Sequence, residues 1–176
     1  SSIGTISYML SDLMQNLAQD FPNICKLDTI GYSVENRLIL SLKIYDNATE
    51  NAPKFFYSST IHGDELTGAV VLLHLADYLL KNHQTNNEIQ NLISNMQIYI
   101  CPIANPDGVY AGGNNNVSNA TRYNANYVDL NRNFDCDWEE VSCLYNETSV
   151  MPESGTYRGL YPNSEPETQA LINMTE

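Results

Sequence analysis

The sequence predicts an α/β domain with a mixed, largely parallel central sheet flanked by helices. Strand-type and helix-type hydrophobic patterns alternate along the first part of the chain, and this alternation favours a layered α/β architecture. No repeat or linker divides the 176 residues, a length typical of one domain. No apolar run approaches the roughly 20 residues that a membrane span needs.

The first elements are a helix and two strands. Apolar residues recur at helical spacing over residues 6–17, and Pro22 ends this pattern because proline cannot continue a helix. Two β-rich stretches follow at residues 24–30 and 38–45, joined by a short polar segment. We therefore expect two neighbouring strands after the helix.

The next elements surround a long apolar segment. A third strand is expected at residues 54–61, and the run 65–80 is apolar nearly all round, which indicates a buried helix. A shorter helix at 88–96 leads into a fourth strand at 97–103. The regular pattern then fades, and a helical pattern returns only at 165–174.

The chain is strongly acidic, with 8 Lys and Arg against 21 Asp and Glu and a formal net charge of −13. Phosphate affinity comes from clustered basic side chains, so we expect no nucleic-acid partner and no anionic-membrane surface. Asn-x-Ser/Thr sequons favour a secreted protein, extracellular or periplasmic; five are present, beginning at Asn47, Asn116, Asn119, Asn146 and Asn173.

The four cysteines contain no CxxC or CxxH pair, which argues against a structural zinc knuckle. Cys136 and Cys143 lie in a polar stretch and could close a small disulfide. Cys25 and Cys101 lie in apolar, strand-like surroundings, so we expect both to be buried thiols.

A candidate metal-binding pair lies where the third strand gives way to the long helix. The segment His62-Gly63-Asp64-Glu65 places His62 at the strand end and Glu65 on the first helical turn, with Gly63 allowing a sharp turn between them. Imidazole and carboxylate are ordinary zinc ligands, and open α/β sheets carry their sites at such junctions. The alternative is a solvated His–Glu pair at a helix start, with Glu65 favoured by the helix dipole.

Two of the four arginines, Arg122 and Arg132, lie close together in a stretch rich in amides. In an acidic chain they form a local positive spot, suited to holding a carboxylate by a bidentate fork. The alternative is that both arginines pair with acidic neighbours such as Asp129, Asp135 or Asp137.

Four motifs together resemble those of the zinc metallocarboxypeptidases. They are His62-Gly63-Asp64-Glu65, Asn105-Pro106-Asp107-Gly108, Arg122 followed by residues 129–134, and residues 157–167. The stretch 124–134 looks more similar to the carboxypeptidase N/E and bacterial branch than to the digestive A/B branch. The resemblance covers essentially the whole chain and implies the α/β fold of that family.

The resemblance implies one zinc ion per site. His62 and Glu65 match two of the family's three protein ligands, and Asp129 matches the carboxylate that orients a ligating imidazole. The third ligand, a histidine, and the general base, a glutamate, belong to later motifs of the family that have no match here. We expect His74 and His83 to be packing or surface residues.

The resemblance also implies that the partner is a peptide or protein C-terminus. Asn131 and Arg132 match the residues that bind the free C-terminal carboxylate. Arg122 matches the residue that polarises the scissile carbonyl and stabilises the oxyanion. Residues 105–108 are expected to shape the turn under the site, and the protein is expected to be a monomer.

The sequence thus predicts a zinc-dependent metallocarboxypeptidase that releases C-terminal amino acids by metal-activated attack of water. Residues 1–176 are expected to form the N-terminal portion of a single peptidase catalytic domain. Two alternatives stay open: a catalytically incomplete fragment or inactive homologue that binds peptide C-termini, and a related zinc amidohydrolase of small N-acyl amino acids.

Overall fold

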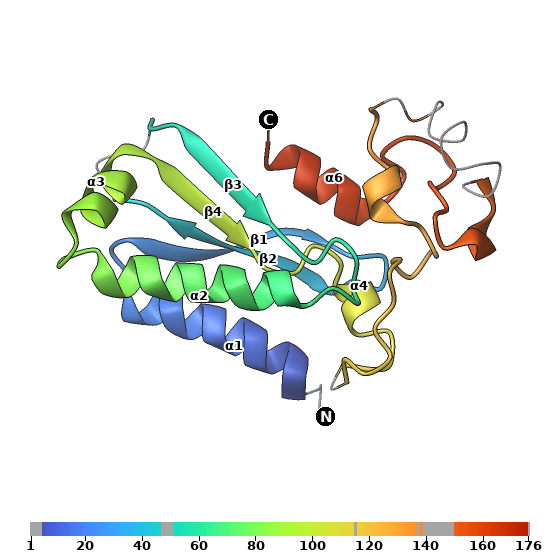
Figure 1. The fold of residues 1–176 in the computed structure, drawn as a ribbon, viewed down its shortest axis with the longest axis horizontal. Helices are drawn as coiled ribbons and strands as arrows, with labels where there is room; N and C mark the ends of the chain where they lie inside the picture. The colour runs from blue at the N-terminus through green and yellow to red at the C-terminus, as the bar shows by residue number, and fades with distance from the viewer. Residues whose placement is uncertain (1–4, 47–50, 115, 137, 139–149, 176) are drawn as a thin grey trace.

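The computed structural model describes residues 5–46, 51–114, 116–136, 138 and 150–175. A four-stranded mixed sheet lies at its centre, with helices on both faces (Figure 1). The strands are β1 (Cys25–Tyr32), β2 (Leu38–Ile44), β3 (Lys54–Ser58) and β4 (Gln97–Cys101). The helices are α1 (Thr5–Asp20), α2 (Thr67–Asn82), α3 (Asn87–Asn95), α4 (Pro106–Val109) and α6 (Pro166–Asn173), with short 3-10 turns η2 (Leu130–Arg132) and η4 (Pro152–Ser154).

The strand order is β1-β2-β4-β3. β1 and β2 are antiparallel because the short turn at residues 33–37 connects them directly, and β2 is also antiparallel to β4. β3 and β4 are parallel because α2 and α3 carry the chain back across the sheet between them. The predicted mixed sheet is confirmed; in the described residues, one of its three strand pairings is parallel.

The main core fills the space between the sheet and the helices α1 and α2. Leu42, Ile44, Ile98 and Ile100 point to this side, and all four are buried. The helix α6 lies on the opposite face of the sheet, as Figure 1 shows. Its Ala170 packs there against Ile39 and Cys101. The parallel pairing of β3 with β4, continued by backbone hydrogen bonds beyond both strands, places the carboxyl end of β3 next to the segment after β4.

The helix α2 is less buried than its composition predicts. One side packs on the sheet, but Val70, Val71 and Tyr78 on the other side are each more than half exposed. Within the described residues, the helix that was predicted to be buried is therefore buried on one side only.

Cys25 and Cys101 are buried thiols, as predicted. Burial raises the pKa of each to about 12, so neither carries a reactive thiolate near neutral pH. The predicted Cys136–Cys143 disulfide lies outside the described residues, because Cys143 is not among them. In the part of the chain that the structure describes, no helix is both long enough and apolar enough to cross a membrane.

Candidate metal and substrate site

His62 and Glu65 lie in the turn that joins β3 to α2. β3 ends at Ser58 and α2 begins at Thr67, so neither residue lies on the strand or helix where the sequence placed it. A hydrogen bond from the Glu65 backbone N to the His62 carbonyl O (3.1 Å) closes the turn. The closed turn brings His62 Nδ1 to 3.2 Å from Glu65 Oε1, and the two side chains converge.

Asp129 holds the imidazole from the other side. Its side chain is fully buried, and Oδ1 lies 3.1 Å from His62 Nε2. Oδ1 also accepts from the Asn131 backbone N (3.2 Å), while Oδ2 accepts from Arg122 Nε (3.0 Å) and Nη2 (2.8 Å). A buried carboxylate needs hydrogen bonds and an opposite charge to offset its lost hydration. Asp129 has both.

Asp129 favours one tautomer of the His62 ring. Its Oδ1 can only accept, so it suits a ring proton on Nε2, 3.1 Å away. Nδ1 faces both a donor, Arg122 Nη1 at 3.3 Å, and an acceptor, Glu65 Oε1 at 3.2 Å. This tautomer leaves Nδ1 able to ligate a metal ion.

The spacing of the His62–Glu65 pair fits two ligands of one zinc ion. With bonds of about 2.0–2.1 Å, two ligand atoms of a tetrahedral zinc ion lie about 3.3 Å apart, close to the 3.2 Å between Nδ1 and Oε1. Among the described residues, no group of three His, Cys, Asp or Glu side chains could hold a metal ion. The described residues therefore fit two positions of a zinc site, and a third protein ligand would have to come from outside them.

The other two histidines do not join this pair. His74 is exposed on α2, and His83 follows the last residue of that helix. His83 Nδ1 lies 2.6 Å from the Leu80 carbonyl O, and its ring contacts the edge of Phe21. Both are surface or packing residues, as the sequence predicts.

Asn131 and Arg132 lie on η2, the 3-10 turn that starts directly after Asp129. The Asp129 side chain caps this turn, and the backbone carbonyl O of Asp129 accepts from the Arg132 backbone N (2.8 Å). Asn131 is exposed and Arg132 is half-buried. The Arg132 Nη1 donates to the Asn131 carbonyl O (3.1 Å). The same residue that orients His62 therefore fixes the backbone of the amide and guanidinium pair.

A buried polar network behind the site was not foreseen from the sequence. Asn124 Nδ2 donates to Glu165 Oε2 (2.8 Å) and to Glu167 Oε2 (3.0 Å). Asn124 Oδ1 accepts two backbone N–H groups of residues 126–128, at 3.0 and 3.1 Å. This network fixes the loop that carries Arg122 against α6.

Glu167 is a fully buried member of this network. Burial raises the pKa of Glu167 from its ordinary 4.5 to about 7; the negative charge of Asp107 adds to this rise, and hydrogen bonds from Asn124 and the Val34 backbone N oppose it only in part. The folded protein therefore binds this proton more tightly than the unfolded chain does. The stability from this group is complete below pH 4.5 and falls by about 3 kcal/mol as the pH rises through 7.

Replacing Glu167 by Gln should remove this part of the pH dependence. The amide carries no titrating proton, so the decline in the free energy of unfolding between pH 4 and pH 8 should be smaller than in the wild-type protein by about 3 kcal/mol. Urea unfolding at the two pH values measures this difference. Glu88→Gln, at an exposed position on α3, is the matched control, and an unchanged slope in Glu167→Gln would contradict the assignment.

Comparison with known proteins identifies the family. The family model described as zinc carboxypeptidase matches residues 10–176. The chain is 35% identical to human carboxypeptidase D over 133 residues, which are 73% of this chain and 10% of that protein. It is 36% identical to mouse carboxypeptidase M over 146 residues, which are 80% of this chain and 32% of that protein.

Solved structures show the same fold. The chain superposes on carboxypeptidase A from Helicoverpa armigera with a TM-score of 0.78 and 28% identity, over 98% of this chain and 42% of that one. It thus spans less than half of the length of each of these three relatives. The sequence match and the shared fold agree, and the chain belongs to the zinc carboxypeptidase family.

Proposed function

We propose that this chain is the N-terminal portion of a single peptidase catalytic domain, and that the domain is a zinc-dependent metallocarboxypeptidase. The observation that carries the proposal is the convergence of His62 Nδ1 and Glu65 Oε1 at 3.2 Å, with Nε2 held by the buried Asp129. Such a pair, oriented by a carboxylate, is the arrangement that a zinc-binding imidazole requires.

His62 and Glu65 would hold one zinc ion through Nδ1 and a carboxylate oxygen. A zinc ion in such a site activates a water molecule and polarises a carbonyl group. Asp129 keeps the ligating ring in the required tautomer, and its bond to Arg122 keeps the guanidinium beside the same ring. Family membership supports zinc as the metal.

The substrate would be the free C-terminus of a peptide or protein. Arg132 and Asn131 would bind the terminal carboxylate, since guanidinium and amide groups suit its two oxygens. Arg122, one third exposed at the site, would donate to the carbonyl oxygen of the scissile bond and stabilise the negative charge that develops there. Together these groups would restrict hydrolysis to the last peptide bond. The protein would act as a secreted monomer.

A second candidate is a protein that binds peptide C-termini without cleaving them. It would use the same carboxylate-binding pair, Asn131 and Arg132, which lie together on η2. A zinc amidohydrolase of small N-acyl amino acids is the third candidate. Release of free amino acid from a longer peptide separates the peptidase from both.

Replacing Arg132 by Ala in the complete domain tests the substrate assignment. Loss of two charge-assisted hydrogen bonds to the carboxylate should lower kcat/KM for a peptide with a free C-terminus by about 100-fold or more, mainly through KM. Lys81→Ala, which removes an exposed positive charge paired with Asp77 on α2, is the control. An unchanged kcat/KM in Arg132→Ala would exclude Arg132 as the carboxylate anchor.

A further inference from the structure

We propose that Asn105 is a positioning residue for the site, and that its side-chain amide sets the place of the metal-binding turn relative to Arg122. The proposal rests on the proposed function, because it assigns Asn105 a role in that same site. Asn105 itself touches neither metal nor substrate.

The Asn105 side chain is fully buried and makes three hydrogen bonds, all of them to backbone groups. Its Oδ1 accepts from the Gly108 backbone N (2.8 Å), which caps α4. Its Nδ2 donates to the Ile61 carbonyl O (3.2 Å) and to the Arg122 carbonyl O (3.4 Å). One amide group therefore joins three separate segments of the chain.

Two of these three segments carry the reacting side chains. The Ile61 carbonyl belongs to the peptide unit that leads directly into His62, and the Arg122 carbonyl belongs to the arginine itself. The two hydrogens of Nδ2 therefore fix His62 and Arg122 relative to one common atom. A shift of this atom would change the contact between Arg122 Nη1 and His62 Nδ1, now 3.3 Å.

Backbone contacts make this arrangement tight. A Cβ atom at Gly63 would lie 2.2 Å from the Gly108 carbonyl carbon, so the turn that carries His62 lies directly on α4. The Gly108 carbonyl O accepts from the Thr121 backbone N (2.8 Å), on the other side. Because α4 is wedged between the two loops, there is no space in which a small displacement could be absorbed.

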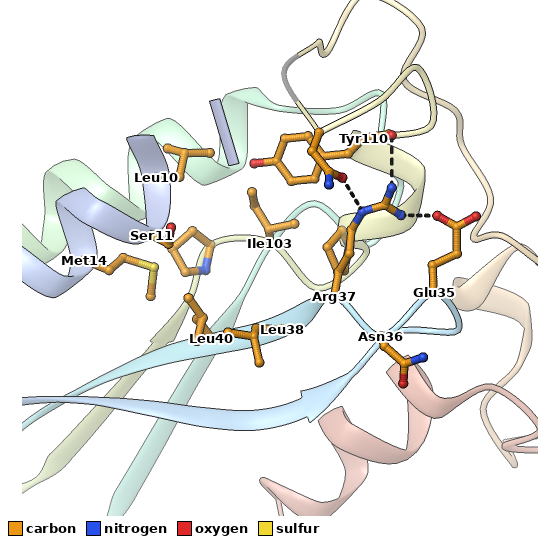
Figure 2. Close-up of a pocket in the computed structure, with 13 residues that line it drawn as sticks. Leu10, Ser11, Met14, Glu35, Asn36, Arg37, Leu38, Leu40, Ile103 and Tyr110 are labelled. Atoms are coloured by element: carbon orange, nitrogen blue, oxygen red, sulfur yellow. Dashed lines mark hydrogen bonds and ion pairs between the residues drawn. The ribbon is translucent and has the colours of Figure 1, made fainter. Parts of the chain in front are cut away.

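The helix α4 is also held on its other side, through the side chain of Asp107. Its Oδ1 accepts from Ser33 Oγ (2.7 Å) and Arg37 Nη1 (2.6 Å), and its Oδ2 accepts from the Glu35 backbone N (2.9 Å). Arg37 lies on the wall of a pocket of about 400 Å³ and also bonds to the Tyr110 carbonyl (Figure 2). These contacts hold α4 to the β1–β2 turn, while Asn105 holds it to the site.

A substitution that keeps the shape of Asn105 but removes its donor groups distinguishes a positioning role from a role in filling space. An aspartate at position 105 has nearly the same shape and keeps the acceptor for Gly108. It cannot donate, and it would direct negative charge at two carbonyl oxygens. The carbonyl groups of Ile61 and Arg122 would lose their donor, and a buried polar group without a partner is costly. Asn105→Asp should therefore displace the loops that carry His62 and Arg122, although the side-chain volume is nearly unchanged.

The experiment compares Asn105→Asp, Asn105→Ser and Ser33→Ala with the wild-type complete domain loaded with zinc. We expect both Asn105 variants to bind zinc 10- to 100-fold more weakly, as for other partners that orient a ligand. We also expect kcat for a free peptide C-terminus to fall by a similar factor with KM within about threefold. Ser33→Ala removes one of three hydrogen bonds to Asp107, and the other two still hold α4 in place, so this variant should lose stability without either change.

Hydrogen exchange in the metal-free protein gives a readout that is independent of peptidase activity. In Asn105→Asp and Asn105→Ser, exchange should become faster in residues 61–65 and 121–124 together, and in Ser33→Ala only in residues 33–37. In the unmodified protein, zinc should shift the NMR resonances of the Asn105 side-chain amide.

A wild-type protein that released no amino acid would contradict the proposed function but not the positioning role of Asn105. Wild-type zinc affinity in the Asn105 variants, or an Asn105 amide unmoved by zinc, would overturn the positioning role.

Discussion

Replacing Asp129 by Asn lowers kcat/KM of the complete domain by about 100-fold or more, because Asp129 orients the ligating imidazole and also holds Arg122. The carboxylate accepts from His62 and Asn131 on Oδ1 and twice from Arg122 on Oδ2. An asparagine must place an NH2 group on one side, where it meets donors only. If the NH2 group faces Arg122, the guanidinium loses both bonds. If it faces His62, Nε2 must become the acceptor, and the proton moves to Nδ1.

Steady-state kinetics on a peptide with a free C-terminus measure this loss. Asp135→Asn is the matched control, because Asp135 is exposed and lies close in sequence to the same turn. Circular dichroism establishes that Asp129→Asn is folded at the assay temperature. A folded variant with wild-type kcat/KM would show that Asp129 does not orient the imidazole.

Replacing Glu65 by Gln weakens zinc binding by more than about 100-fold, the upper range for partners that only orient a ligand. The neutral amide removes the negative charge, and its oxygen is a weaker zinc ligand than a carboxylate. The side chain is 64% exposed, so the substitution leaves no buried group unpaired and should cost little stability. Loss of the metal should therefore come without unfolding.

Competition with a chelator of known affinity measures the zinc dissociation constant of each variant. Asp64→Asn is the control, since Asp64 is the exposed acidic neighbour of Glu65 and has the same effect on net charge. Equal zinc affinity in the Glu65→Gln variant and the wild-type protein would remove Glu65 from the ligand set.

The order of helices and strands could be predicted because it depends on local patterns. The helical spacing in α1, the β-rich stretches of β1 and β2, and the proline after α1 act within a few residues of one another. The boundaries differ from the prediction: β3 ends at Ser58 and α2 begins at Thr67, so the candidate metal-binding pair lies in a turn. Gly63 was expected to permit a sharp bend, whereas the structure needs it for the close approach to Gly108.

The buried asparagines could not be recognised from sequence in the same way. The chain has 22 asparagines, most of them in polar loops. Asn105, Asn124 and Asn133 lie in stretches that resemble family motifs, but nothing local predicts that they are buried. The structure buries all three, and each bonds to segments distant along the chain. Their roles depend on tertiary contacts. The motif at residues 157–167 marked the position of Glu165 and Glu167 but gave no reason for their burial.

The central claim is that this chain contributes to a zinc-dependent carboxypeptidase. Mass spectrometry of one peptide with a free C-terminus and of its amidated twin, incubated with the complete domain, tests it most directly. We expect loss of a single C-terminal residue from the free peptide only, arrest of this loss by a zinc chelator, and recovery when zinc is added. Intact free peptide, equal cleavage of the amidated twin, or release that continues under chelation would contradict the claim.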